Sequence, residues 1–201
     1  AHALVKSIDT TLAETLEGVE AVCTGADFPD VQTAASANTG EVDISVKALA
    51  ELMIARQKVL FEGHPVAAVA ARTLEIAEQA ISLIKVEYEE LKAVQDPVEA
   101  MAPDAPLLDE KLHTDSMGGK SEKPSNVALH VELGRGDVDK AFAESDVIVE
   151  REFKTAIVHQ GYIEPEAETA WVRPDGHVQV WADTQGIFDH RSQLAQVLAM
   201  P

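Results

Sequence analysis

The chain has 201 residues, of which 46% are hydrophobic, so it can bury a core in one large domain or two small ones. Lysine and arginine total 16 against 35 acidic residues, and the resulting formal net charge of −19 argues against nucleic acid as a partner. The longest apolar runs, such as residues 66–71, are far shorter than the roughly 20 residues that a bilayer crossing needs, so we also expect no membrane partner.

The cysteine content and the N-terminal residues limit which metal sites, which disulfides and which cellular location we expect. Cys23 is the only cysteine, so this chain cannot build an internal disulfide, a cysteine-rich zinc site or an iron–sulfur cluster. Residues 1–6 begin without Met and lack the charged and then apolar pattern of a signal peptide. We interpret this start as a cut inside a longer chain, and we expect a cytoplasmic protein.

The first part of the chain is predicted to alternate strands and helices. Hydrophobic spacing and turn residues predict strands at 3–8 and 19–24 with a short helix between them, a polar loop at 26–43 and a helix at 46–54. This pattern favours the α/β (α+β) class.

The clearest pattern lies between residues 58 and 94. A turn leads into a buried run at 66–71, Thr73 caps a predicted helix, and 86–91 follows as a strand. Strand, helix and strand in this order suggest a βαβ-like crossover of about 30 residues. The junction at 71–73 lacks the glycines of a dinucleotide fingerprint, so a nucleotide-binding domain is not supported.

A proline-rich and charged stretch divides the chain. Residues 96–126 hold four prolines and many charges with no sustained period, which is typical of a long connection. We therefore predict a first domain at 1–95, a connecting segment at 96–135, and a second domain at 136–201 that is incomplete.

The second domain is predicted to open with a capped helix at 137–142 and a strand at 147–154. A hairpin at 169–184 follows, with its turn at 173–176. The helical pattern at 188–200 gathers apolar side chains on one face, and we expect that face to lie uncovered because little chain follows it. Those side chains are Leu194, Val197 and Leu198.

Residues 158–168 combine His159 with three carboxylates, Glu164, Glu166 and Glu168. On a strand, alternate residues share a face, so a metal or acid–base site is one interpretation. A hydrolytic metal site normally brings two or more histidines, and a glycosidase pair depends on a carboxylate separation that sequence does not give. A solvated acidic strand edge is the favoured interpretation.

Residues 183–186 end a predicted strand and lead into a helix. Backbone amides and the side-chain amide of Gln185 can meet a ligand at such a junction. The alternative is that Gln185 caps the helix or binds water.

Groups of residues along the whole chain, in order and at regular spacing, match the motifs of one family. They are 1–3, 6–9, 18–19, 22–27, 61–70, 86–91, 94, 96–97, 136–138, 141–142, 149–150, 159, 164–165 and 184–185. These motifs resemble the molybdenum hydroxylases, the relatives of xanthine dehydrogenase and aldehyde oxidase.

The resemblance implies an a/b-hammerhead domain at 1–95 and, from 136, the truncated start of a molybdopterin-binding domain. It implies a molybdenum held by a pterin dithiolene, with Gln185 near its oxo ligand and Gly186 beside it as the cofactor-binding residues. In the family the glutamate base lies beyond Pro201, so we assign no catalytic base and no metal ligand to this chain, and we expect it to be inactive alone.

The resemblance also implies a reaction and partners. An aldehyde or N-heterocycle is hydroxylated with water as the oxygen source, and electrons pass to [2Fe–2S] and FAD centres on partner domains or subunits. Gly186 and Asp189 lack the side chains found there in purine-oxidising relatives, which argues against a purine substrate. The remainder of the molybdenum subunit, FAD-binding and iron–sulfur subunits and a small-molecule substrate are the expected partners.

Two rival functions stay open at this point. One is a stand-alone acidic interaction module with the hammerhead fold, which would need a closed core. The other is a carboxylate hydrolase that uses Glu164, Glu166 or Glu168.

Overall fold

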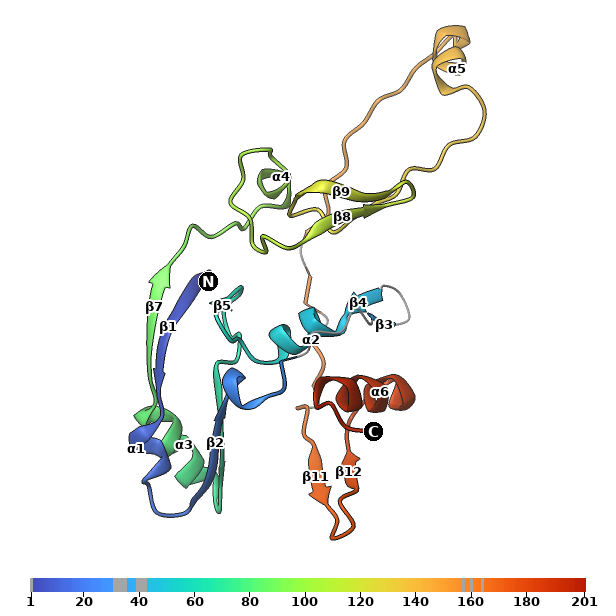
Figure 1. Cartoon of the computed structure of the whole chain (residues 1–201). Coiled ribbons are helices and arrows are strands. Elements are labelled where there is room, and N and C mark those ends of the chain that lie inside the picture. The colour runs from blue at the N-terminus through green and yellow to red at the C-terminus, as the bar shows by residue number, and fades with distance from the viewer. Residues whose placement is uncertain (1, 31–35, 39–42, 157, 160, 164) are drawn as a thin grey trace.

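Small sheets of two or three strands, interspersed with helices, make up the fold in the computed structural model (Figure 1). The structure describes residues 2–30, 36–38, 43–156, 158–159, 161–163 and 165–201. Within these ranges, the mixture of short strands and helices confirms the predicted α/β (α+β) class. None of the helices described is long and apolar enough to cross a bilayer.

Two strand–helix–strand units form the first part of the chain. Each strand of one unit pairs in antiparallel register with a strand of the other unit: β1 pairs with β7, and β2 pairs with β6. The short strand β5, which lies between the units in sequence, pairs with the other edge of β1. The predicted βαβ-like crossover is therefore wrong, because β6 and β7 lie in different sheets and each pairs with a strand of the other unit. The elements are β1 (Ala3–Asp9), α1 (Thr11–Glu14), β2 (Val19–Thr24), β5 (Lys58–Val59), β6 (Ala67–Ala71), α3 (Leu74–Leu83) and β7 (Lys85–Glu90).

Helices α1 and α3 pack closely through small residues. Ala13 on α1 and Ala80 on α3 are fully buried. Gly18 has a φ of +91°, and a Cβ added there would lie 2.7 Å from the Ile76 side chain, so only glycine suits this turn. The Thr73 hydroxyl accepts a hydrogen bond of 3.3 Å from the Ile76 amide, which confirms that Thr73 caps α3.

Helix α2 (Val46–Met53) confirms the helix predicted at 46–54. The last helix, α6 (Ile187–Val197), packs against it. Val197 is 2% exposed and packs against Val46 and Ala50 of α2. The expectation that the apolar face of this last helix would lie uncovered is wrong. The cover comes from α2, in the first half of the chain, rather than from residues after Pro201.

The polar loop predicted at 26–43 lies partly outside the described residues. Within it, η1 (Gly25–Asp27) is a short 3-10 helix, and β3 (Ser36–Asn38) pairs with β4 (Asp43–Ser45) as a hairpin. The loop prediction is therefore wrong for 36–38 and for Asp43, because such short strands give no clear alternating pattern.

The stretch predicted as an irregular connection has regular structure. It contains α4 (Pro97–Ala100) and a three-stranded sheet in the order β10–β8–β9. Its strands are β8 (His113–Ser116), β9 (Gly119–Pro124) and β10 (Leu129–His130), and β10 pairs with β8 in parallel. Short strands of mixed polar residues gave no alternating pattern, which is why composition alone concealed them.

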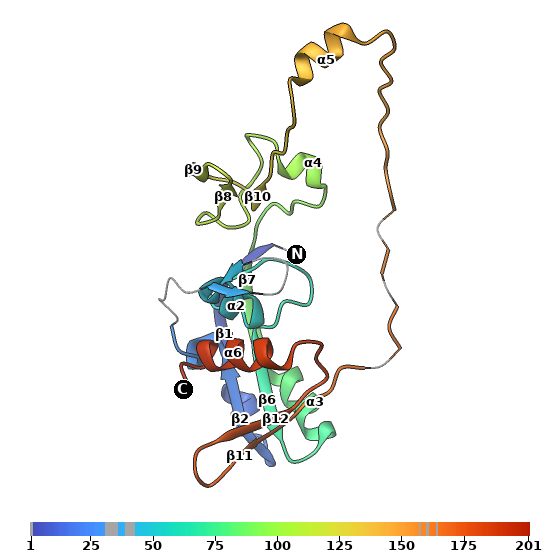
Figure 2. The same ribbon diagram turned by 90° about the vertical axis from the view of Figure 1, so that its right-hand side faces the viewer.

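A long extended loop with α5 (Val138–Glu144) near its tip follows, away from the rest of the chain (Figure 2). The helix is as predicted, and the Asp137 carboxylate accepts a hydrogen bond of 2.9 Å from the Lys140 amide to cap it. The strand predicted at 147–154 is wrong, because no described strand pairs with this segment.

The predicted hairpin is confirmed. β11 (Thr169–Val172) and β12 (Val178–Trp181) pair in antiparallel register, and the Arg173 amide donates to the His177 carbonyl at 2.8 Å across the turn. Gly176 supplies the positive φ of +85° that this turn requires. The hairpin leads directly to α6.

Substituting Val197→Ala should lower the free energy of unfolding by roughly 1–3 kcal/mol, because it leaves a cavity between α2 and α6. Val98→Ala is the matched control, since Val98 is 70% exposed on α4 and its truncation should change stability by less than about 0.5 kcal/mol. Urea denaturation of both variants measures the difference. Equal stabilities would contradict the packing of α6 on α2.

Candidate functional site

Gln185 lies in the short link between β12 and α6. The Thr184 hydroxyl accepts a hydrogen bond of 3.2 Å from the Gly186 amide, so a local turn fixes the backbone on both sides of Gln185. The Gln185 side chain is exposed and has no hydrogen-bond partner among the described residues. Its amide group is therefore free to bind a ligand.

The start of α6 is not capped by any side chain. Gly186 is the N-cap residue, and its carbonyl accepts the first helical hydrogen bond, 2.9 Å from the His190 amide. Backbone N–H groups of the first turn and the helix dipole favour a ligand that presents oxygen acceptors. Asp189, also in the first turn, is the acidic group that such a ligand would meet.

Gly186 differs from the glycines that the fold itself requires. A Cβ added at Gly186 would find Asp189 Oδ2 at 3.4 Å, an ordinary contact, and its φ of −131° suits any residue. By contrast, a Cβ at Gly25 would lie 2.9 Å from the Ala55 carbonyl oxygen. The fold does not demand glycine at 186, so the missing side chain leaves the backbone beside Gln185 open to a ligand.

These groups fit an oxygen-bearing cofactor and do not fit a metal held by side chains. No cluster of three or more His, Cys, Asp or Glu that could hold a metal ion occurs in the described part of the chain. Cys23, on β2, is half-buried and lies on a different element.

Residues 158–168 do not form the shared face that a strand would give. Glu164 lies outside the described residues, and His159, Glu166 and Glu168 are exposed on an extended chain without a strand. His159 Nδ1 accepts a hydrogen bond of 3.0 Å from the Gly161 amide, so its ring is used in a local turn. The predicted strand edge is wrong here, and the geometry gives no support to a carboxylate hydrolase.

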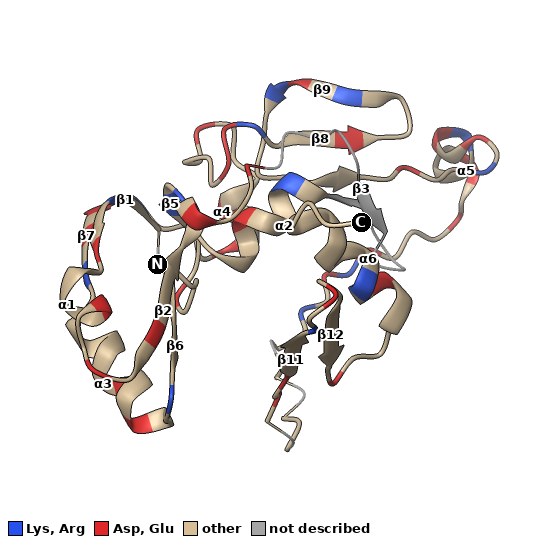
Figure 3. Cartoon of the chain, turned by 60° about the horizontal axis from the view of Figure 1, so that its bottom comes forward, with Lys and Arg blue, Asp and Glu red and all other residues tan. Residues whose placement is uncertain are grey.

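Acidic residues are spread over many elements and not gathered at one place along the ribbon (Figure 3). The charge of −19 is therefore a property of the surface as a whole. It does not mark a cation site.

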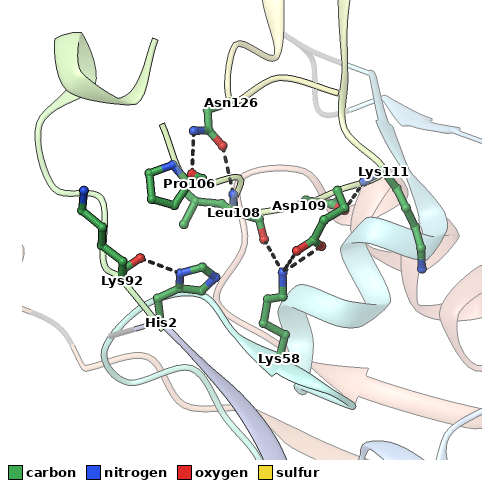
Figure 4. Close-up of polar contacts among 9 residues, drawn as sticks. His2, Lys58, Lys92, Pro106, Leu108, Asp109, Lys111 and Asn126 are labelled. Carbon is green, nitrogen blue, oxygen red and sulfur yellow. Dashed lines mark hydrogen bonds and ion pairs between the residues drawn. The ribbon is translucent and has the colours of Figure 1, made fainter. Parts of the chain in front are cut away.

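A polar cluster that sequence reasoning missed joins β5 to the region after α4 (Figure 4). The largely buried Lys58 ammonium donates to both Glu110 carboxylate oxygens, at 2.7 and 2.8 Å, and to the Leu108 carbonyl at 3.1 Å. This hydrogen bond from Lys58, with that of the Glu110 backbone amide, holds the pKa of Glu110 below its usual range. No motif connects residues so far apart in sequence, so the pair could not be found from the chain alone.

Asn126 completes this cluster. Its Nδ2 donates to the Ala100 and Pro106 carbonyls, both at 3.0 Å, and its Oδ1 accepts from the Leu108 amide at 2.9 Å. The hydrogen bonds of Asn126 thus all go to backbone groups of residues 100–108. We interpret the cluster as a set of contacts that hold residues 100–126 in place against β5, and not as a ligand site.

A shallow hollow lies over β1, β5 and β7, lined in part by His2, Phe61, His64 and Tyr88. The buried His64 has both ring nitrogens occupied: Nδ1 accepts from the Leu60 amide at 3.2 Å, and Nε2 lies 2.9 Å from the Glu51 carbonyl. Its ring stacks on Phe61, with centroids 4.5 Å apart. His64 therefore stabilises the turn that follows β5, and neither of its ring nitrogens is free to bind a ligand.

Two family models match the chain. Residues 1–92 match the aldehyde oxidase and xanthine dehydrogenase, a/b hammerhead domain, and residues 120–201 match the molybdopterin cofactor-binding domain. Among curated relatives, a probable xanthine dehydrogenase subunit of Bacillus subtilis is 32% identical over 200 residues. The carbon monoxide dehydrogenase large chain of Afipia carboxidovorans is 32% identical over 205 residues. Each match covers 100% of this chain, and the chain spans only 24% of each relative.

Solved structures agree with these matches. Quinoline 2-oxidoreductase from Pseudomonas putida 86 superposes with a TM-score of 0.78 at 28% identity, and CO dehydrogenase from Oligotropha carboxidovorans superposes with 0.76 at 29%. In both, the match covers 100% of this chain and 24% of the solved chain. The similarity thus extends over the whole chain in sequence and in fold.

The Lys58–Glu110 pair makes stability depend on acid pH. Since the folded pKa of Glu110 is lowered, its stabilisation is complete above the unfolded value of about 4.3 and is lost as pH falls through the folded pKa. Glu110→Gln should therefore cost roughly 0.5–1 kcal/mol at pH 7, and the difference from the native protein should shrink as the pH falls below the unfolded value. Denaturant titrations at several pH values measure this.

Glu132→Gln is the control, because Glu132 is exposed and has no ion pair among the described residues. It should match the native protein across the pH range. A Glu110→Gln loss of stability that does not change as the pH falls would contradict the ion pair as its cause.

Proposed function

This chain belongs to the aldehyde oxidase and xanthine dehydrogenase family, and on that premise we propose that it forms part of the large, molybdopterin-binding subunit of a molybdenum hydroxylase. The order of the two matched domains and the share of about a quarter of each relative support this assignment. The division into a hammerhead domain at 1–95, a connecting segment at 96–135 and the start of the cofactor domain at 136–201 is part of the proposal.

The observation that carries the proposal for the site is the free Gln185 amide beside the uncapped start of α6. Gln185 would donate a hydrogen bond to an oxygen ligand of the cofactor, and Gly186 would leave space for the approach. When bound, the molybdenum–pterin group would supply the two-electron oxidation that the residues of this chain lack. Gln185 thus orients a ligand and is not assigned a proton transfer.

The proposed reaction is the hydroxylation of an aldehyde or N-heterocycle with water as the oxygen source. Relatives are named for xanthine, carbon monoxide, nicotinate and quinoline, so a small molecule is the shared class of substrate. We place the [2Fe–2S] and FAD centres on partner domains or subunits, because the single Cys23 cannot build a cluster in this chain. A stand-alone acidic interaction module has no observation in its favour.

Gln185→Ala should lower kcat of the cofactor-loaded enzyme by about 10- to 100-fold with molybdenum content unchanged, because one oriented donor to the cofactor is lost. Gln179→Ala on β12 is the matched control, since Gln179 is also exposed on the same hairpin. Steady-state turnover and metal analysis of both variants test the role. Native turnover in Gln185→Ala, or equal losses in the two variants, would exclude Gln185 as a cofactor contact.

A further inference from the structure

Residues 182–186 link β12 to α6, and hydrogen bonds hold this link at one residue, Gly186 (Figure 1). The Gly186 amide donates to the Thr184 hydroxyl at 3.2 Å, and the Gly186 carbonyl accepts from the His190 amide at 2.9 Å. Among the described residues, no other hydrogen bond involves the backbone of Thr184 or Gln185. The Thr184 hydroxyl therefore makes the one described contact that closes the chain around Gln185.

Thr184 restricts the backbone where the next two residues do not. It is half-buried, whereas Gln185 is exposed. A hydroxyl that accepts from the amide two residues later fixes the two peptide groups on either side of the residue between them. Gly186 cannot impose this restriction by itself, because glycine adopts many backbone conformations at little steric cost. The direction in which the Gln185 side chain leaves the backbone thus depends on Thr184.

Helix α6 gives this turn a fixed point. Val197 of α6 is 2% exposed and packs against α2, so the helix is held by the first part of the chain. The Gly186 carbonyl is bonded to the first turn of that helix, and the Gly186 amide is bonded to Thr184. Gln185 therefore stands between two residues that are joined to each other and to α6.

We propose that Thr184 is a positioning residue for Gln185. By accepting the hydrogen bond from the Gly186 amide, its hydroxyl orients the Gln185 side-chain amide toward the cofactor. Thr184 acts through Gln185, and it is assigned no contact with cofactor or substrate and no proton transfer. The inference rests on the proposed function and adds a second residue to its site.

Thr184→Val removes the hydroxyl at nearly the same volume, and Thr184→Ser keeps it. In the enzyme purified from its own source with its copurifying subunits, Thr184→Val should lower kcat about tenfold and change KM less than about twofold, because a misdirected donor slows the reaction. Thr184→Ser should keep at least about half of the native kcat. Thr169→Val, at an exposed position on β11, is the control and should match the native enzyme. Equal losses in Thr184→Val and either other variant would overturn the proposal.

A double-mutant cycle tests whether Thr184 acts through Gln185. If it does, the effect of the hydroxyl disappears once the side chain that it orients is gone. Thr184→Val should therefore change kcat by less than about twofold in the Gln185→Ala background. A further loss of about tenfold in that background would mean that the hydroxyl acts independently, and it would overturn the positioning role.

Hydrogen–deuterium exchange of the Gly186 amide measures the turn independently of turnover. Thr184→Val should speed this exchange by about three- to tenfold, because the amide loses its acceptor, and Thr184→Ser should leave it unchanged. The Leu198 amide, bonded to the Leu194 carbonyl at the other end of α6, is the internal reference. A native exchange rate at Gly186 in Thr184→Val would overturn the proposal. An equal increase at Leu198 would show that α6 as a whole had loosened, which would also overturn it.

Assay of released pterin on the native enzyme separates the two proposals. Pterin present, with native turnover and native Gly186 exchange in Thr184→Val, would overturn the role of Thr184 alone. Pterin absent from the native enzyme would overturn the proposed function, and Gly186 exchange in Thr184→Val would still decide whether the hydroxyl holds the turn around Gln185.

Discussion

The antiparallel exchange of strands between two strand–helix–strand units is the constraint on which the rest of the structure depends. β1 pairs with β7 and β2 pairs with β6, so each strand pairs with a strand of the other unit and not with the strand across its own helix. The chain between the units forms α2, and Val46 and Ala50 of this helix pack against Val197 of α6. The Gln185 loop leads directly into α6, so its position depends on this frame.

Features set by neighbouring residues could be predicted from the sequence. The Thr73 cap, α5 with its Asp137 cap, and the 173–176 turn each depend on contacts within a few residues. Features set by distant partners could not. The βαβ-like crossover, the strand at 147–154 and the uncovered face of α6 were wrong, because strand pairing and helix packing depend on contacts between residues far apart in the chain.

The candidate site shows the same division. From the residues alone, Gln185 is either a ligand contact at a strand–helix junction or a residue that caps the helix or binds water, and the resemblance favoured the ligand contact. The structure adds that its amide is free and that Gly186 is not required by the fold. The Lys58–Glu110 pair has no sequence signature, since it joins a strand to a loop about fifty residues later. The pair stabilises the fold, and its role is distinct from the ligand-binding role proposed for Gln185.

Molybdenum content, measured by plasma mass spectrometry on the gene product purified from its own source with whatever copurifies, tests the central claim most directly. The account predicts close to one molybdenum per chain, with iron and flavin in the associated domains or subunits. A folded product that contains no molybdenum would contradict it.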